Sequence, residues 1–172
     1  MEKGYIQVYT GDGKGKTTAA LGLALRAAGA GLRIYIAQFM KKGEYSEIRA
    51  LQRLSDRITV DQFGTGRFIR GKPDPEDLEA AGKGIAAVHD AMRAGTYDMV
   101  VLEEANVAYG AGVVTEDDLL GVIEAKPDGV ELIFTGRGGA PGVMEKADLI
   151  TEMNPLRHYF DNGVAARTGI EN

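Results

Sequence analysis

The sequence predicts an α/β fold: a parallel β-sheet with helices on both faces, forming a single domain over residues 1–172. Short apolar segments typical of buried strands alternate with helical segments along the whole chain. A glycine-crowded turn joins the first of these strands to the first helix. The length of 172 residues suits one domain with its own hydrophobic core, and no repeat or linker interrupts it.

Six segments are expected to be strands because they are short, apolar and bounded by turn residues. In chain order they are 5–10, Leu32–Phe39, Ile58–Phe63, Met99–Glu103, Val130–Thr135 and Leu149–Met153. Open parallel sheets bind ligands beyond the carboxyl ends of their strands. Function is therefore expected in the loops that follow these segments.

Helices are expected between the strands. Thr17–Ala28 is rich in Ala and Leu, and Tyr45–Leu54 also has helical character. A third helix begins at Asp74, with a capping residue, a proline in the first turn and acids at its positive end. A fourth begins at Thr115, where Thr-Glu-Asp-Asp resembles a capping box. The third helix carries an apolar stripe with spacings of three and four: Leu78, Ala81, Ile85, Val88 and Met92.

The turn after the first strand has the composition of a polyphosphate-binding loop. Its glycines let successive backbone N–H groups point inward, and the helix that follows offers its positive N-terminal end to an anion. Lys16 is placed to reach phosphates, and the Thr17 hydroxyl to bind Mg²⁺. The usual pattern would have its first glycine at position 10, but the glycine stands at Gly11.

An incidental glycine-rich turn is the alternative interpretation, and it fits poorly because strand, loop and helix all agree with a phosphate site. The sequence therefore predicts a nucleoside triphosphate site in a P-loop NTPase-like fold. The residues expected to form it are Thr10, Gly11, Asp12, Gly13, Lys14, Gly15, Lys16, Thr17 and Thr18.

Two acids, Glu103 and Glu104, end the apolar strand that begins at Met99. In P-loop proteins an acid at this place holds magnesium and aligns the attacking group. The alternative is a strand that simply ends in solvated carboxylates. Because adjacent strand residues point to opposite faces, only one of the two is expected to face the nucleotide.

Two further loops carry candidate ligand-binding side chains. The segment 64–71 combines glycines, two arginines, Phe68 and Ile69. It could fold over a large flat ligand, although an ordinary surface loop with a buried anchor explains this segment equally simply. Arg137 follows a strand at the expected ligand edge, where it could neutralise phosphate charge or form a salt bridge.

Composition excludes several classes of function. A net charge of −5 leaves no basic surface for nucleic acid. The absence of cysteine excludes disulfides and thiolate zinc sites, and His89 and His158 lie too far apart for metal-ligand spacing. No apolar run approaches the ~18 residues of a membrane span. The N-terminus also lacks a signal-peptide pattern, so a soluble cytoplasmic protein is expected.

Together these features resemble the P-loop type of corrinoid adenosyltransferase, the ATP:cob(I)alamin adenosyltransferase family, over almost the whole chain. The shifted glycine of the phosphate loop is itself a feature of that family, and generic P-loop ATPases lack the matching tail. The segments that carry the resemblance are 10–20, 38–41, 64–66, 102–104, 135–138, 155–163 and 169–171.

The resemblance implies an enzyme that transfers the 5′-deoxyadenosyl group of ATP to Co(I) of cobalamin or a corrinoid precursor, releasing triphosphate. Since Co(I) is a strong nucleophile, the protein's tasks would be positioning and charge stabilisation. Catalytic roles are implied for Lys16, Thr17 and Glu104, with Mg²⁺ or Mn²⁺ held by Thr17 and Glu104, and Arg137 joins the ATP site. The implied corrinoid contacts are Gly64, Thr65, Gly66, Phe68 and Ile69.

The chain departs from the family pattern in three ways. Glu103 stands where the family has aspartate, and one extra methylene changes what this acid can reach. Related proteins often carry Gly-Thr-Gly-Phe-Thr-Trp, whose aromatic side chains displace the lower axial ligand of cobalt. This chain has no tryptophan, so Phe68 or Ile69 is expected to do that work. An N-terminal helical extension that covers the corrinoid in some members is not found here, which predicts a homodimer with a more open corrinoid site.

The resemblance also implies a reductase or a reduced flavin as the source of electrons for Co(I). Two rival functions remain compatible with the phosphate loop. An ATP-hydrolysing motor or switch would use Glu103 or Glu104 to activate water and would release ADP and orthophosphate. A regulatory nucleotide-binding module would bind ATP without turnover.

Overall fold

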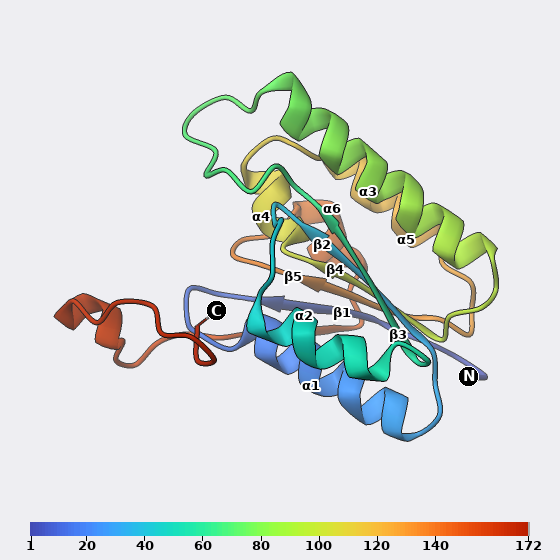
Figure 1. Cartoon of the computed structure of the whole chain (residues 1–172). Coiled ribbons are helices and arrows are strands. Elements are labelled where there is room, and N and C mark those ends of the chain that lie inside the picture. The colour runs from blue at the N-terminus through green and yellow to red at the C-terminus, as the bar shows by residue number, and fades with distance from the viewer. Residues whose placement is uncertain (172) are drawn as a thin grey trace.

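The computed structural model describes residues 1–171, which form a sheet layer between two layers of helices (Figure 1). The strands are β1 (Ile6–Thr10), β2 (Ile34–Phe39), β3 (Ile58–Phe63), β4 (Met99–Glu103), β5 (Glu131–Thr135) and β6 (Leu149–Glu152). The helices are α1 (Lys16–Gly29), α2 (Ser46–Leu51), α3 (Pro75–Arg93), α4 (Ala105–Gly110), α5 (Glu116–Glu124) and α6 (Pro141–Lys146), with 3₁₀ turns η1 (Gln52–Leu54) and η2 (Tyr159–Asn162).

All six strands belong to one parallel sheet in the order β3-β2-β4-β5-β1-β6. Helices α1 and α2 lie on one face, and α3 and α5 lie on the other (Figure 1). The predicted α/β fold, with a parallel sheet between helices, is therefore confirmed. Because the strands are parallel, the loops that follow them all leave from the same edge of the sheet.

Alternation along the central strands builds one core on each face of the sheet. In β2, Ile34 and Ile36 pack with the helices α1 and α2, whereas Tyr35 and Phe39 pack with α3 and α5. Both faces are covered, so β2 is buried along its full length. Helix α1 contributes a row of small side chains that allows it to approach the sheet closely: Ala20, Ala24 and Ala27.

The element boundaries agree with the sequence-based prediction to within two residues at most strand and helix ends. The segment predicted as one helix over 45–54 is divided into α2 and η1. The apolar stripe of α3 is buried from Ala81 to Met92, but Leu78 was wrongly included because its side chain is 46% exposed. The short helices α4 and α6 were not predicted, since six residues are too few to display a helical period.

Two residues other than glycine in the described chain have positive φ, and both lie at the ligand edge of the sheet. Met40 follows β2 and Glu104 follows β4, each with φ 61°. This left-handed conformation is uncommon for such residues and persists only where the surrounding structure holds it. The backbone therefore turns sharply at the ends of these two adjacent strands.

Helix α3 approaches the sheet closely at Gly84, and this contact generates a stability prediction. A Cβ at Gly84 would lie 2.7 Å from the ring of Phe39 and 2.9 Å from Phe63, whereas a Cβ at Gly82 meets nothing within 4 Å. We expect Gly84→Ala to lower the free energy of unfolding by about 1–3 kcal/mol through overpacking. Gly82→Ala should instead raise it by about 0.5–1 kcal/mol, because alanine reduces the entropy of the unfolded chain.

Urea unfolding of both variants provides the measurement, and Gly82→Ala is the matched control because it lies in the same helix. Equal shifts in the same direction would contradict the close approach at Gly84.

Candidate active site at the carboxyl edge of the sheet

The phosphate loop runs from the end of β1 into α1 and is shaped by contacts that exclude side chains. Gly11 and Gly15 have φ values of 94° and 122°, a region that favours glycine. A Cβ at Gly11 would lie 2.5 Å from the carbonyl oxygen of Met153, and one at Gly13 would lie 2.6 Å from it. The Gly13 N–H donates to that same oxygen at 2.6 Å. The segment after β6 therefore supports the loop from behind.

Lys16 lies within the curve of this loop. Its ammonium donates to the carbonyl oxygens of Gly11 at 2.6 Å and Gly13 at 2.7 Å. Burial lowers the pKa of Lys16, and the positive charge of Arg137 lowers it further, while Glu104 acts in the opposite direction. The structure thus places the predicted phosphate-binding lysine inside the loop, with Arg137 and Glu104 close enough to affect its charge.

The acid that meets the phosphate loop directly is Glu103. The Thr17 hydroxyl donates to Glu103 Oε1 at 2.6 Å, from the first turn of α1 to the end of β4. Lys41, which follows β2, donates to the same oxygen at 3.2 Å and lies 3.2 Å from Oε2. The Glu103 side chain is fully buried, and its Oε2 has no hydrogen bond of its own among the described residues.

The charges of this buried pair depend on each other. Burial raises the pKa of the Glu103 carboxyl above its ordinary value, although Lys41 favours its charged form. Burial alone would lower the pKa of Lys41, but the neighbouring carboxylates, Glu103 first and then Glu104 and Glu47, leave it raised. Each member of the pair thus favours the charged form of the other, as expected for a charge pair largely removed from water.

Glu104 does not follow the alternation of β4, because its left-handed backbone ends the strand and begins α4. Its N–H donates to the Thr135 hydroxyl at 3.0 Å, which ties this turn to the end of β5. The charge of Glu104 opposes the lowering of the Lys16 pKa and contributes to the raised pKa of Lys41. Both acids thus act on the same site, although we expected only one of them to face it. The metal contact expected for Glu104 stays a prediction.

Thr17 and Glu103 together fit a magnesium ion. Mg²⁺ prefers oxygen ligands and is commonly held by one or two protein groups, with phosphates and water completing its shell. The Thr17 hydroxyl and a carboxylate with one oxygen that accepts no hydrogen bond supply such groups where α1 begins and β4 ends. Residues 1–171 contain no cluster of three or more His, Asp or Glu side chains that could hold a metal without a substrate.

Arg137, Thr10 and Asp12 surround the phosphate loop on the β5 side. The Thr10 hydroxyl donates to the carbonyl oxygen of Gly138, which joins the loop after β5 to the end of β1. The Arg137 guanidinium lies 3.6 Å from Asp12, with both side chains largely exposed. An exposed pair of this kind is weak, so Arg137 is free to exchange Asp12 for a phosphate. Thr18, which was also expected in the ATP site, is exposed in the first turn of α1.

The loop after β3 is expected to contact a corrinoid. Its two apolar side chains, Phe68 and Ile69, differ in their exposure to solvent. Ile69 packs against the core beside Met40 and Phe63, whereas Phe68 is 96% exposed. The Thr65 hydroxyl donates to Asp77 at 2.7 Å, which attaches the loop to the first turn of α3. Ile69 is therefore the partly buried anchor of an exposed loop, and Phe68 is the residue of the two that is available to a ligand.

The start of this loop also touches the segment after β2. A Cβ at Gly64 would lie 2.6 Å from the backbone of both Met40 and Lys41. Gly66 has φ 76° and lies against Lys42. Only glycine fits these positions, so the loop after β3 and the segment that carries Lys41 are packed backbone to backbone.

The C-terminal segment leads from β6 past the phosphate loop (Figure 1). Lys14 donates to the Tyr159 hydroxyl at 3.0 Å, the Ile170 carbonyl at 2.6 Å and Glu171 Oε1 at 2.6 Å. Arg167, Lys14 and Tyr159 together hold the pKa of Glu171 well below its ordinary range. Lys14, expected to bind phosphate, is thus directed to the tail.

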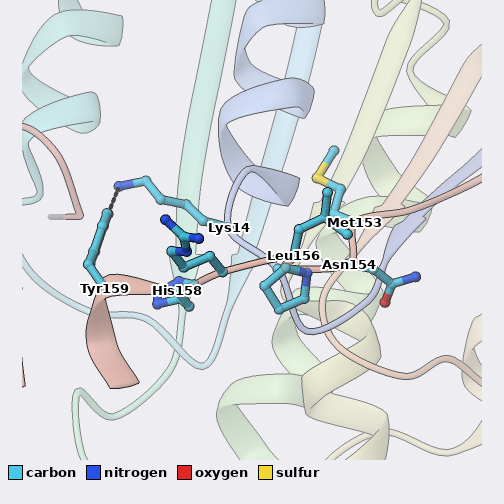
Figure 2. Close-up of a pocket in the computed structure, with 9 residues that line it drawn as sticks. Lys14, Met153, Asn154, Leu156, His158 and Tyr159 are labelled. Atoms are coloured by element: carbon cyan, nitrogen blue, oxygen red, sulfur yellow. Dashed lines mark hydrogen bonds between the residues drawn. The ribbon is translucent and has the colours of Figure 1, made fainter. Parts of the chain in front are cut away.

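A cavity of about 280 Å³ lies between the phosphate loop and this tail. Figure 2 shows Lys14 and Tyr159 on one side of it, joined by their hydrogen bond, and Met153 and Asn154 on the other. The lining residues are Gly13, Lys14, Met153, Asn154, Pro155, Leu156, Arg157, His158 and Tyr159.

Sequence reasoning gave no role to three polar residues at this edge, of which Gln38 and Asn106 are buried and Lys41 is partly buried. Lys41 pairs with Glu103, as described above. Gln38 pairs in register with Glu103 on the neighbouring strand, and its Nε2 has no hydrogen-bond partner among the described residues. Asn106, in α4, donates to the Gly136 carbonyl at 3.2 Å. The signal that could have identified Gln38 is a polar residue inside an otherwise apolar strand.

The fold and the glycine-rich loop place this chain among α/β proteins with a P-loop NTPase-like architecture. The chain belongs to the family described as ATP:corrinoid adenosyltransferase BtuR/CobO/CobP, whose family model matches residues 2–172. This result confirms the resemblance stated from the sequence and makes the protein a member of a family of transferases.

Individual relatives agree with this assignment. A corrinoid adenosyltransferase of Pseudomonas aeruginosa is 31% identical over 171 residues, covering 99% of this chain and 84% of that protein. The corrinoid adenosyltransferase CobA of Salmonella typhimurium is 34% identical over 175 residues, covering 99% of this chain and 86% of that protein. An uncharacterised protein of Nostoc is 38% identical, and the match spans 45% of its length.

The two acids at the end of β4 can be separated by a pair of substitutions. Because Thr17 contacts Glu103, we expect Glu103→Gln to raise the Mg²⁺ concentration required for ATP binding by about 10–100-fold. Glu104→Gln should raise it by less than about threefold. Calorimetric titration with ATP at several Mg²⁺ concentrations measures both, and thermal unfolding checks that each variant is folded. The reverse order would assign the metal contact to Glu104.

Proposed function

We propose that this protein transfers the 5′-deoxyadenosyl group of ATP to Co(I) of a corrinoid, with release of triphosphate. The observation that carries the proposal is the hydrogen bond between Thr17 and Glu103, which joins the phosphate loop to a strand-end acid. Membership of the ATP:corrinoid adenosyltransferase family supports both substrates. The corrinoid enters this reaction as a substrate, and its cobalt forms the new bond to the 5′ carbon of ATP.

The chain's residues would position ATP and stabilise the departing triphosphate. Backbone amides of the loop 11–18 would bind the phosphates, apart from the Gly13 N–H, which donates to Met153. Lys16 and Arg137 would supply positive charge beside them. A divalent cation held by Thr17 and a strand-end acid, Mg²⁺ or Mn²⁺, would neutralise the charge that develops on the triphosphate. The catalytic roles expected for Lys16 and Thr17 belong to this proposal. The metal contact expected for Glu104 is proposed for Glu103 instead, because Glu103 contacts Thr17.

No general base is required, because Co(I) is itself the nucleophile. What the protein must provide is alignment of the cobalt, the 5′ carbon and the leaving oxygen, together with exclusion of water. The loop after β3 lies at the same edge of the sheet and offers the exposed Phe68 above glycines at positions 64 and 66. Its proposed contacts with the corrinoid are Gly64, Thr65, Gly66, Phe68 and Ile69.

The proposal includes a reductase or a reduced flavin that generates Co(I), a homodimeric assembly, and either cobalamin or a precursor as acceptor. It also places the enzyme in the cytoplasm. No helix in residues 1–171 is long and apolar enough to cross a membrane.

An anaerobic incubation with ATP, Mg²⁺ and chemically reduced cob(I)alamin tests the proposal. A light-sensitive adenosylcobalamin spectrum with one triphosphate per corrinoid would support it. An unchanged corrinoid with ADP and orthophosphate appearing would assign the protein to the ATPases instead. ATP binding without any product, with cobalamin and with a precursor corrinoid, would indicate a nucleotide-binding module.

Substitution of the loop lysine provides a direct prediction. Lys16→Ala should lower turnover by at least about 100-fold, because an ammonium that stabilises the leaving group is lost. The unfolding midpoint should remain close to that of the unsubstituted protein, since Lys16 contacts only carbonyl oxygens of its own loop. Lys83→Ala, on the exposed face of α3, is the matched control. Normal turnover in Lys16→Ala would remove the phosphate loop from the mechanism.

A second prediction concerns the corrinoid side. If Phe68 displaces the lower axial ligand, Phe68→Ala should impair adenosylation that starts from Co(II) and a reductant more than adenosylation of chemically prepared Co(I). Because Phe68 is 96% exposed, the substitution should leave stability almost unchanged. Parallel assays from the two oxidation states make the comparison, and equal losses in both would contradict an axial-ligand role.

A further inference from the structure

Lys41 has contacts in both halves of the proposed site. Its ammonium lies 3.2 Å from both oxygens of Glu103, on the nucleotide side. It also lies 3.8 Å from Glu47 and 5.3 Å from the ring centre of Tyr45. Its backbone packs against Gly64, on the side expected to receive the corrinoid. The side chain of Lys41 therefore contacts the expected nucleotide side, and its backbone contacts the expected corrinoid side.

The backbone connection is rigid and under constraint. The Met40 N–H donates to the Phe63 carbonyl at 3.1 Å, which fixes the end of β2 against the end of β3. Met40 has φ 61°, an uncommon value for a residue with a side chain. The approach of Gly64 leaves no room even for a methyl group beside Met40 and Lys41. A shift of the backbone at Met40 and Lys41 would therefore be transmitted to the loop at 64–69.

The Lys41 ammonium occupies a position at Glu103 that a bound metal ion would also require. Glu103 is fully buried, and Thr17 and Lys41 are its polar contacts. A divalent cation bound to Thr17 and Glu103 would stand beside a second positive charge, in a place where water cannot screen the repulsion. The ammonium and the metal therefore compete for one carboxylate.

We propose that Lys41 is a positioning residue that occupies the cation position at Glu103 until a divalent cation arrives with ATP. Its displacement then shifts the backbone at 40–41 and repositions the loop at 64–69. This inference rests on the proposed function, because it assumes that metal and ATP bind at Thr17 and Glu103. Lys41 would thereby couple nucleotide binding to the conformation of the loop at 64–69, which is expected to contact the corrinoid.

The absence of tryptophan from the chain allows a clean optical test. Phe68→Trp places a single tryptophan in the loop at 64–69, and its emission reports on that loop without any turnover. In this background, tryptophan emission is followed as Mg²⁺ is added, once with ATP and once without it. ATP binding is measured by calorimetry at the same Mg²⁺ concentrations. The same titrations are then repeated with Lys41→Met, and with Lys42→Met as the exposed neighbouring control.

With Lys41 present, ATP and Mg²⁺ together should change the emission, and neither should do so alone. In Lys41→Met, the Mg²⁺ concentration for half-maximal ATP binding should fall about tenfold, because the competing charge is gone. The emission should no longer depend on Mg²⁺. Lys42→Met should behave like the parent protein, and Lys41→Arg, which keeps the charge, should restore the dependence.

Three results would overturn the inference. One is an unchanged Mg²⁺ requirement in Lys41→Met, and another is an emission change that survives the substitution. The third is an equal loss of ATP affinity with and without Mg²⁺, which would make Lys41 a simple phosphate ligand. If Lys41→Met does not fold, Lys41→Gln removes the charge while offering the carboxylate a hydrogen bond. Failure of the parent protein to bind ATP would instead reject the proposed function itself.

Discussion

The buried carboxylate of Glu103 is the group on which the arrangement of the site depends. A carboxylate removed from water must be neutralised and hydrogen-bonded, and here the partners come from α1 and from the segment after β2. These elements are distant in sequence, and the parallel sheet brings them to one edge. The electrostatic requirement of one side chain thus fixes the relative positions of the phosphate loop and the adjoining strands.

Much of the fold could be predicted because its signals are local. Each strand is a short apolar run, and the caps at Asp74 and Thr115 are formed by residues within one helical turn. The phosphate loop was also visible, since its glycines, lysine and threonine are consecutive. Leu78 shows the limit of such reasoning: its spacing fits the buried stripe, but its side chain is exposed while that of Asp77 in the same turn is buried.

The parts of the site that could not be predicted depend on contacts between distant segments. The left-handed backbone of Glu104, which belongs to the β4–α4 turn and to its bond with Thr135, could not be read from the alternation of the strand before it. The contact between Lys41 and Glu103 has no local signal at all. Phe68 and Ile69 look interchangeable in sequence, and only the packing around Met40 distinguishes the anchor from the exposed ring.

The carbonyl of Met153 supports the phosphate loop by accepting from Gly13, and this ties the shape of the loop to a strand far along the chain. Met153 directly follows β6, which lies at the edge of the sheet and pairs with β1. If β6 separated from this edge, the other five strands could stay paired, but the loop would lose its backing. Detachment of one edge strand would therefore reduce the ability to hold a nucleotide before the rest of the sheet unfolds.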